Sequence, residues 1–174
     1  FTPFGSSGVP DNSLCNVGYF LRKTGLDYGQ LMAMLDLPFI HPDGEIVIQH
    51  LDWSCDTGRK LIQGLIPGRL DRLDRIHRFL RLWRKLDGWE MWELDLAIRC
   101  PGIGHRDDSD AWSLDETVLR NLHGLERLKS RLGADTTVEQ LCALFGDLNT
   151  TTRFTEPHEK RAEGLYQGLF LNRR

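Results

Sequence analysis

One local pattern occurs three times in this chain and constrains its fold more than any other feature. In each copy, a glycine that can end a helix precedes a residue that can cap the next helix, followed three positions later by Gln or Glu and then by leucine. The three copies are Gly25, Asp27, Gln30 and Leu31; Gly88, Glu90, Glu93 and Leu94; and Gly133, Thr137, Gln140 and Leu141. Because each copy joins one helix to another, the pattern predicts an all-α (mainly α) fold of packed irregular helical hairpins. The copies are unevenly spaced, which excludes a regular solenoid.

Apolar residues at helical spacing place the helices around these junctions. We predict helices over 13–23, from Asp27 onward, over 70–86, over 91–99, from a capping box at 113–116 to Leu132, from Thr137 to Phe145, and over the last turns around 165–169. Residues 38–68 break the pattern with two prolines and Asp43-Gly44, and they form a predicted irregular insert. Within this insert we expect one strand over 45–51 and a short helix over 59–65.

Composition narrows the class of protein. The 174 residues are 40% hydrophobic and 27% charged, with a formal net charge of -3, which is typical of a soluble globular chain rather than a disordered one. No apolar run approaches the roughly 18 to 20 residues that span a bilayer, and the net charge offers no global attraction to nucleic acid. The sequence begins with Phe1 and has no signal-peptide pattern, so we expect a piece of a longer protein.

The four cysteines, Cys15, Cys55, Cys100 and Cys142, are far apart in the sequence. They include no CxxC pair of the kind that closes a zinc site, and they lack the tight spacing of a secreted disulfide scaffold. We therefore predict ordinary unpaired thiols. Cys100 and Cys142 lie in or beside predicted helices, where a cysteine usually acts as a small buried side chain.

The predicted helix at 69–85 is strongly basic and is the first candidate functional element. Its arginines recur at every third residue, so they spiral around the helix and do not form one phosphate-facing stripe. Binding of nucleic acid or lipid is therefore disfavoured. We expect Arg78, Arg81 and Arg84 to pair with acidic residues of neighbouring helices or to extend over apolar surface. Trp83 is the predicted packing anchor, and the other tryptophans are also expected in the core.

An acidic segment is the second candidate. Asp107, Asp108 and Asp110 are possible partners of the basic helix, and the alternative is two solvated charge runs that never meet. Together with His105, these carboxylates also suggest a metal site. A calcium loop that starts at Asp108 would, however, place Trp112 at a ligand position. We therefore predict a solvated linker that holds no metal, and we expect no other cofactor.

Catalytic motifs are absent from the sequence. It contains no P-loop, dinucleotide-binding, nucleophile-elbow or zinc-protease pattern, so we predict no catalytic residues and no enzymatic activity. His77 and His123 fall within predicted helices without a triad-like arrangement, and we expect packed or surface histidines. Either of them can titrate between about pH 5 and 8 and could take part in an acid-triggered rearrangement.

Several segments resemble the A component of the bacterial Tc toxin complexes, a family of virulence-plasmid A-type proteins. The segments are 19–26 with the following Leu31 and Leu35, 70–86, 89–98 and 165–173. The resemblance covers nearly the whole chain after its N-terminal residues, and the run around Trp83 is long and unusual. Two positions depart from the family's pattern: Glu90 stands where a serine-like cap is commoner, and His41-Pro42 stands where an Asn-Pro pair is commoner.

The resemblance implies that residues 1–174 are a single fragment of a larger α-helical shell domain. In that family, the shell surrounds a central channel in a homopentameric prepore and opens on a pH change. The channel then passes a toxic enzyme that the B and C components carry. The implied partners are other copies of the subunit and the B and C components, together with an unidentified host receptor. The resemblance implies a secreted complex, with no nucleic acid and no direct membrane contact from this segment.

Two other functions stay open on the sequence alone. One is a stand-alone helical interaction module that binds an anionic partner through the basic helix at 69–85. The other is a metalloenzyme built on the acidic segment, which the failed calcium-loop spacing disfavours.

Overall fold

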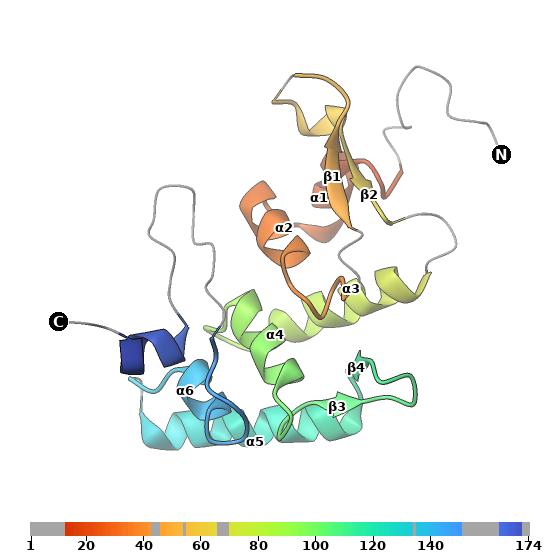
Figure 1. Ribbon diagram of the computed structural model, residues 1–174. Helices are drawn as coiled ribbons and strands as arrows, with labels where there is room; N and C mark the ends of the chain where they lie inside the picture. Colours follow the sequence, from red (N-terminus) through yellow and green to blue (C-terminus); the bar gives the residue numbers. More distant parts are fainter. Residues whose placement is uncertain are drawn as a thin grey trace. The chain divides into compact units, whose positions relative to one another are not determined.

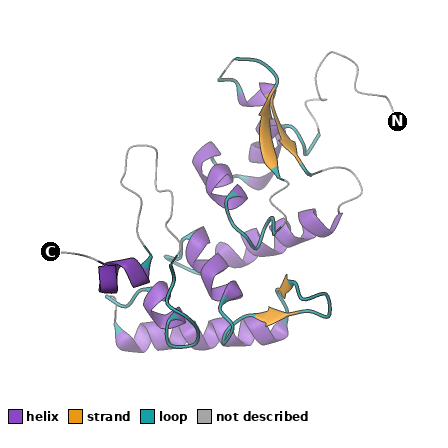
Figure 2. Cartoon of the chain, in the orientation of Figure 1, coloured by secondary structure: helices purple, strands orange, loops and turns teal. Residues whose placement is uncertain are grey.

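The computed structural model describes residues 13–42, 46–53, 55–65, 70–133, 135–150 and 164–171. The chain divides into two compact units, Phe1–Arg84 and Lys85–Arg174, and each unit is described by itself. Helices predominate, and short antiparallel strand pairs accompany them (Figures 1 and 2). The described chain is therefore mainly α. The purely all-α form of the prediction is wrong, because each unit contains a two-stranded sheet.

The first unit begins with two helices joined by the first copy of the recurring pattern. Helix α1 (Val17–Thr24) is followed by Gly25, which adopts a left-handed φ of 68° that a glycine reaches without a steric penalty. Asp27 and Gln30 then form the predicted reciprocal capping box at the start of α2 (Tyr28–Leu35). Helix α1 begins later than predicted, because residues 13–15 form a turn whose Cys15 carbonyl accepts a hydrogen bond from a strand.

A strand pair lies within the predicted irregular insert. Strand β1 (Val47–His50) pairs antiparallel with β2 (Lys60–Gln63), and a 3-10 turn, η1 (Thr57–Arg59), precedes β2. Strand β1 confirms the strand predicted over 45–51, whereas the short helix predicted over 59–65 is wrong. Lys60, Leu61 and Ile62 are all buried. A short buried run of this kind fits a helix or a strand until its neighbours are known.

The start of α1 is attached to this strand pair. Asn16 forms an isolated bridge with Leu61, and its side-chain amide donates to the Gly58 carbonyl at 2.8 Å. The same side chain accepts from Tyr19 N at 3.0 Å and so caps α1. A single asparagine therefore caps a helix and fixes the edge of a sheet.

Helix α3 (Leu70–Trp83) completes the first unit and ends before the predicted residue 86. Its buried side contains Ile76, Phe79 and Leu80. The Phe79 ring lies 5.9 Å from the ring of Phe39, which follows α2. This contact packs α3 against the segment that connects α2 to β1.

The five tryptophans differ in burial. Trp89 is 4% exposed, as expected of a core residue, whereas Trp53 is fully exposed and the core prediction is wrong for it. Trp83, Trp92 and Trp112 are half-buried. Trp83 is therefore a partial anchor and not the fully buried one that was predicted.

This intermediate burial predicts a moderate effect of truncation in α3. We expect Trp83→Ala to lower the free energy of unfolding by about 1–3 kcal/mol, below the roughly 3–5 kcal/mol of a fully buried indole. Arg78→Ala should cost less than about 1 kcal/mol, because Arg78 and its partner Asp74 are both more than half exposed. Urea unfolding followed by circular dichroism compares the two variants. Equal losses would contradict a packing role for Trp83.

The second unit contains the other two copies of the pattern. Gly88 and Gly133 have positive φ angles of 71° and 103°. They precede α4 (Met91–Arg99) and α6 (Val138–Cys142), whose capping positions are Glu90 and Thr137. Both helices begin where predicted. Leu94 and Leu141, the leucines of the pattern, are 0% and 1% exposed.

Helix α5 (Glu116–Leu132) lies between these two junctions in the sequence and ends at Gly133 as predicted. Helix α6 packs against both α4 and α5 (Figure 1). It ends at Cys142, earlier than the predicted Phe145, and Leu144 and Phe145 are exposed. The last described element is the π-helical turn η2 (Gln167–Leu171), which overlaps the terminal helical turns predicted around 165–169 and extends beyond them. Among the helices described, none is long and apolar enough to cross a bilayer.

Candidate functional site

A short hairpin joins α4 to α5 and contains the predicted acidic segment. We call it the charged hairpin (residues 103–115). Strand β3 (His105–Arg106) pairs antiparallel with β4 (Trp112–Ser113). The segment predicted as a solvated linker therefore contains a short strand pair. Two-residue strands are too short to show the alternation by which a strand is recognised in a sequence.

The tip of the charged hairpin is organised by Asp107. Its Oδ1 accepts hydrogen bonds from Ser109 N at 2.9 Å and from Ala111 N at 3.1 Å, and its own N–H donates to the Ala111 carbonyl. Asp110 has a φ of 60°, a left-handed conformation that Asp tolerates better than most residues. Asp107 therefore stabilises the turn at the hairpin tip through hydrogen bonds to its backbone.

Arg106 neutralises part of the acidic segment from within the hairpin. Its guanidinium lies 3.0 Å from the Asp110 carboxylate and 2.8 Å from the Asp110 carbonyl oxygen. The same group lies over the Trp112 ring at 4.2 Å from the ring centre. Asp110 is 82% exposed, so its ion pair with Arg106 contributes little to stability.

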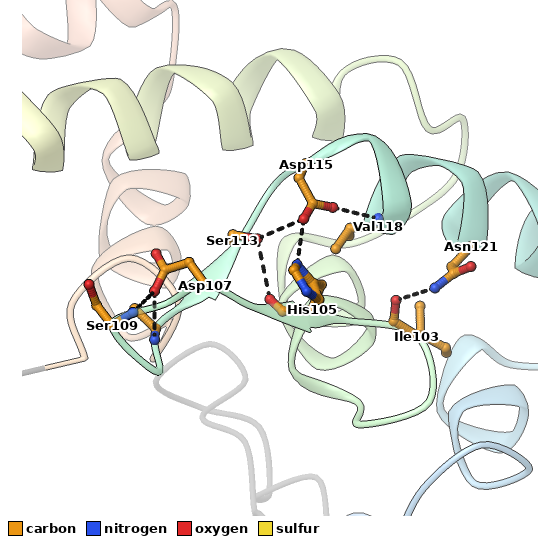
Figure 3. A network of polar contacts seen from close by, with 9 residues as sticks. Ile103, His105, Asp107, Ser109, Ser113, Asp115, Val118 and Asn121 are labelled. Carbon is orange, nitrogen blue, oxygen red and sulfur yellow. Dashed lines mark hydrogen bonds and ion pairs between the residues drawn. The ribbon is translucent and has the colours of Figure 1, made fainter.

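The base of the hairpin holds a denser polar network (Figure 3). His105 Nδ1 lies 2.5 Å from Asp115 Oδ2, and the Ser113 hydroxyl lies 3.3 Å from the same carboxylate oxygen. The other oxygen of Asp115 accepts from Val118 N at 2.9 Å and so caps α5. Asn121, on the next turn of α5, donates to the Ile103 carbonyl at 2.8 Å. The network therefore connects both ends of the hairpin to the start of α5.

The pKa of Asp115 lies below the ordinary value for an aspartate. The largest cause is the backbone N–H of Val118, which donates to the carboxylate. Partial desolvation opposes this effect, and hydrogen bonds and charge from His105 and Ser113 add to it. The folded state therefore favours the ionised carboxylate.

The contacts of this network are those of a helix cap. Ser113 lies against Asp115 and the His105 carbonyl, whereas a nucleophilic triad requires the serine hydroxyl to lie on the imidazole. Within the part of the chain that the structure describes, no group of three or more His, Cys, Asp or Glu side chains is arranged to hold a metal ion. The cap of α5 is Asp115, so the predicted capping box that starts at Ser113 is wrong, because Ser113 belongs to β4.

The residues predicted to interact are distributed over the two units. Trp83 and the arginines lie on α3 or directly after it in the first unit, and the acidic residues lie in the charged hairpin of the second. Ion pairs between the two sets remain a prediction. Arg81 and Asp108 are exposed on α3 and at the hairpin tip. The structure places Arg78 2.8 Å from Asp74, one turn earlier on the same helix.

Three other arginines of this segment donate to backbone carbonyls. The donors are Arg72 to Gly64 O at 2.9 Å, Arg75 to Phe39 O at 3.2 Å, and Arg84 to Thr24 O. Arg72 is 7% exposed. These bonds join α3 to the end of α1, to the segment after α2 and to the segment after β2. These three arginines therefore make contacts within their own unit.

Two carboxylates, Asp115 and Glu139, accept structural hydrogen bonds that were not predicted from the sequence. Asp115 could have been found, because an Asp directly before a helix is as good a cap as a serine. Glu139 has no such local signal. It is 9% exposed, and its carboxylate accepts from the Asn149 side chain at 2.7 Å and from Leu165 N at 3.1 Å. Residues from later in the chain supply these partners.

The chain matches no protein-family model, no curated protein and no solved structure in comparisons with each. The resemblance to the Tc toxin A component therefore depends on the residues quoted from the sequence.

The lowered pKa of Asp115 predicts a specific acid sensitivity. A carboxylate whose pKa falls on folding stabilises the fold above its unfolded pKa, near 3.9, and this contribution is lost as the pH falls through the folded pKa. Asp115→Asn keeps a capping side chain but removes the titrating carboxylate. We therefore expect the urea midpoint of this variant to decrease less than that of the unmodified chain as the pH falls below about 4. Asp108→Asn is the matched control at the hairpin tip and should follow the unmodified chain. If the urea midpoints of all three proteins fell identically at acid pH, the lowered pKa of Asp115 would be contradicted.

Proposed function

We propose that this chain is a non-enzymatic structural segment of a Tc-type toxin A subunit, in which it helps to form the α-helical shell around the channel of a pentameric prepore. The resemblance over residues 19–26, 70–86, 89–98 and 165–173 carries this proposal. The proposed partners of the whole protein are further copies of the subunit and the B and C components, within a secreted complex.

The helix junctions support a packing role. Each copy combines a glycine with positive φ, a residue at the N-cap position of the next helix and a buried leucine. In the first and third copies, the glycine directly follows a helix. These features define where the following helix begins and bury its leucine within its own unit, and none of them supplies a reactive group. The Asp115 network likewise stabilises a helix start.

A stand-alone module that binds an anionic partner through residues 69–85 is less well supported. Arg72, Arg75 and Arg84 donate to backbone carbonyls of their own unit. Arg72 is itself buried, and releasing it to a partner would leave the Gly64 carbonyl without this bond, at a cost of about 1–3 kcal/mol.

The proposal is tested on the complete protein that contains this sequence. We expect its reading frame to encode a subunit much larger than 174 residues, and the purified product to assemble as a homopentamer visible by negative-stain electron microscopy. At neutral pH the closed assembly should release no dye from liposomes, and a pH shift should trigger release. A full-length product close to the size of this chain that stays monomeric would overturn the proposal.

A further inference from the structure

Two cysteines of the second unit meet where α4 contacts α6. Cys100 directly follows α4 as its C-cap, and Cys142 is the last residue of α6. Their exposures are only 5% and 3%. The Cys100 Sγ lies 3.5 Å from the Cys142 carbonyl oxygen, although 42 positions separate the residues in the sequence. Both are free thiols in this structure.

Tight packing holds the Cys100 sulfur in this position. A Cβ atom built on Gly146 would lie 3.0 Å from this sulfur and 3.2 Å from Pro101, so the backbone just after α6 closes over the thiol. On the other side, the turn after α4 is fixed by hydrogen bonds from Ile103 N and Gly104 N to the Cys100 carbonyl. The Cys100 sulfur is therefore held in a tightly packed position beside the end of α6.

The surroundings also favour the reactive form of one thiol. A hydrogen bond from the Cys142 thiol lowers the pKa of Cys100 to about 7; burial opposes this effect, and the N–H groups of Gly102 and Ile103 add to it. The same interaction and burial raise the pKa of Cys142. Near neutral pH, Cys100 is therefore the cysteine that more readily forms the attacking thiolate, and Cys142 stays a neutral thiol.

We propose that Cys100 and Cys142 form a redox-active dithiol, which hydrogen peroxide converts into an intramolecular disulfide that joins α4 to α6. In the first step, the Cys100 thiolate attacks one peroxide oxygen and the O–O bond breaks. Hydroxide leaves and takes up a proton as water, and Cys100 becomes a sulfenic acid. In the second step, the Cys142 sulfur attacks the sulfenic sulfur and the S–S bond forms as the S–O bond breaks. The departing hydroxide takes the Cys142 proton as a second water. The two thiols lose two electrons, which reduce the peroxide.

The other two cysteines allow a clean experiment. Cys55 is exposed and Cys15 is half-buried, and both lie in the first unit. In the full chain carrying Cys15→Ser and Cys55→Ser, only the proposed pair remains. After treatment with hydrogen peroxide, denaturation and alkylation, mass spectrometry should show the loss of two alkylatable thiols and a linked peptide pair containing residues 100 and 142. Dithiothreitol should restore both thiols.

Two further measurements separate this pair from general thiol oxidation. With Cys142→Ser added, Cys100 should accumulate as a sulfenic acid that dimedone traps. The pair should also form its disulfide faster in the native chain than in urea, because folding brings the sulfurs together. Circular dichroism verifies that each variant is folded. Retention of both alkylatable thiols, disulfides between different chains, or equal rates in the native and urea-unfolded chain would overturn the proposal.

Discussion

Replacing Leu94 with alanine is expected to lower the free energy of unfolding of the second unit by about 2–5 kcal/mol. Leu94 is 0% exposed and belongs to α4, which packs against α6. Truncation removes buried methyl groups and leaves a cavity that the surrounding helices fill only in part. Urea unfolding measures the loss, and native-state hydrogen exchange of the α4 amides assigns it to the second unit.

Leu144→Ala is the matched control. Leu144 is also in the second unit, but it is 67% exposed and lies just beyond the end of α6. The same chemical change should therefore alter the free energy of unfolding by no more than about 0.5 kcal/mol. Comparable losses in the two variants would contradict the burial of Leu94 and with it the packing role of the helix junction.

The helix junctions could be predicted because their causes are local. A capping box needs residues only three positions apart, and a helix-ending glycine needs only its own positive φ. Asp27 with Gln30 and Thr137 with Gln140 form these bonds as expected. The remaining junction, at Glu90 and Glu93, forms one bond of this kind: the Glu93 carboxylate accepts from Glu90 N at 2.9 Å. Although Glu90 replaces a serine-like cap, α4 still begins at Met91 as predicted.

The strand pairs could not be predicted as well, because each depends on a partner elsewhere in the chain. Strand β2 is stabilised by β1 and by the bridge from Asn16, and nothing in its own four residues distinguishes it from a helix. The early end of α6 has a similar origin. Residues 143–146 turn over Cys100 and Pro101, whose position the sequence alone does not reveal.

The candidate site shows the same limit for charged residues. A basic helix and an acidic segment in one sequence suggest ion pairs, yet Arg72, Arg75 and Arg84 donate to backbone carbonyls. A carbonyl acceptor has no sequence signature, since every residue carries one. The acidic residues Asp107 and Asp110 likewise bind within their own turn. Opposite charges in a sequence therefore identify polar surfaces better than they identify partners.

A close backbone approach in the second unit predicts the other large effect. A Cβ atom added to Gly104 would lie 1.8 Å from the Ile98 carbonyl oxygen and 3.0 Å from the Trp112 ring. The carbonyl belongs to α4 and cannot move away without disturbing the end of that helix. We expect Gly104→Ala to lower the free energy of unfolding by about 1–3 kcal/mol.

Gly124→Ala is the matched control, on an exposed face of α5 with open space around it. This substitution should instead raise the free energy of unfolding by about 0.5–1 kcal/mol, because alanine favours the helix. Thermal and urea unfolding compare the two substitutions. A stabilising Gly104→Ala would mean that the chain does not pass this close to the end of α4.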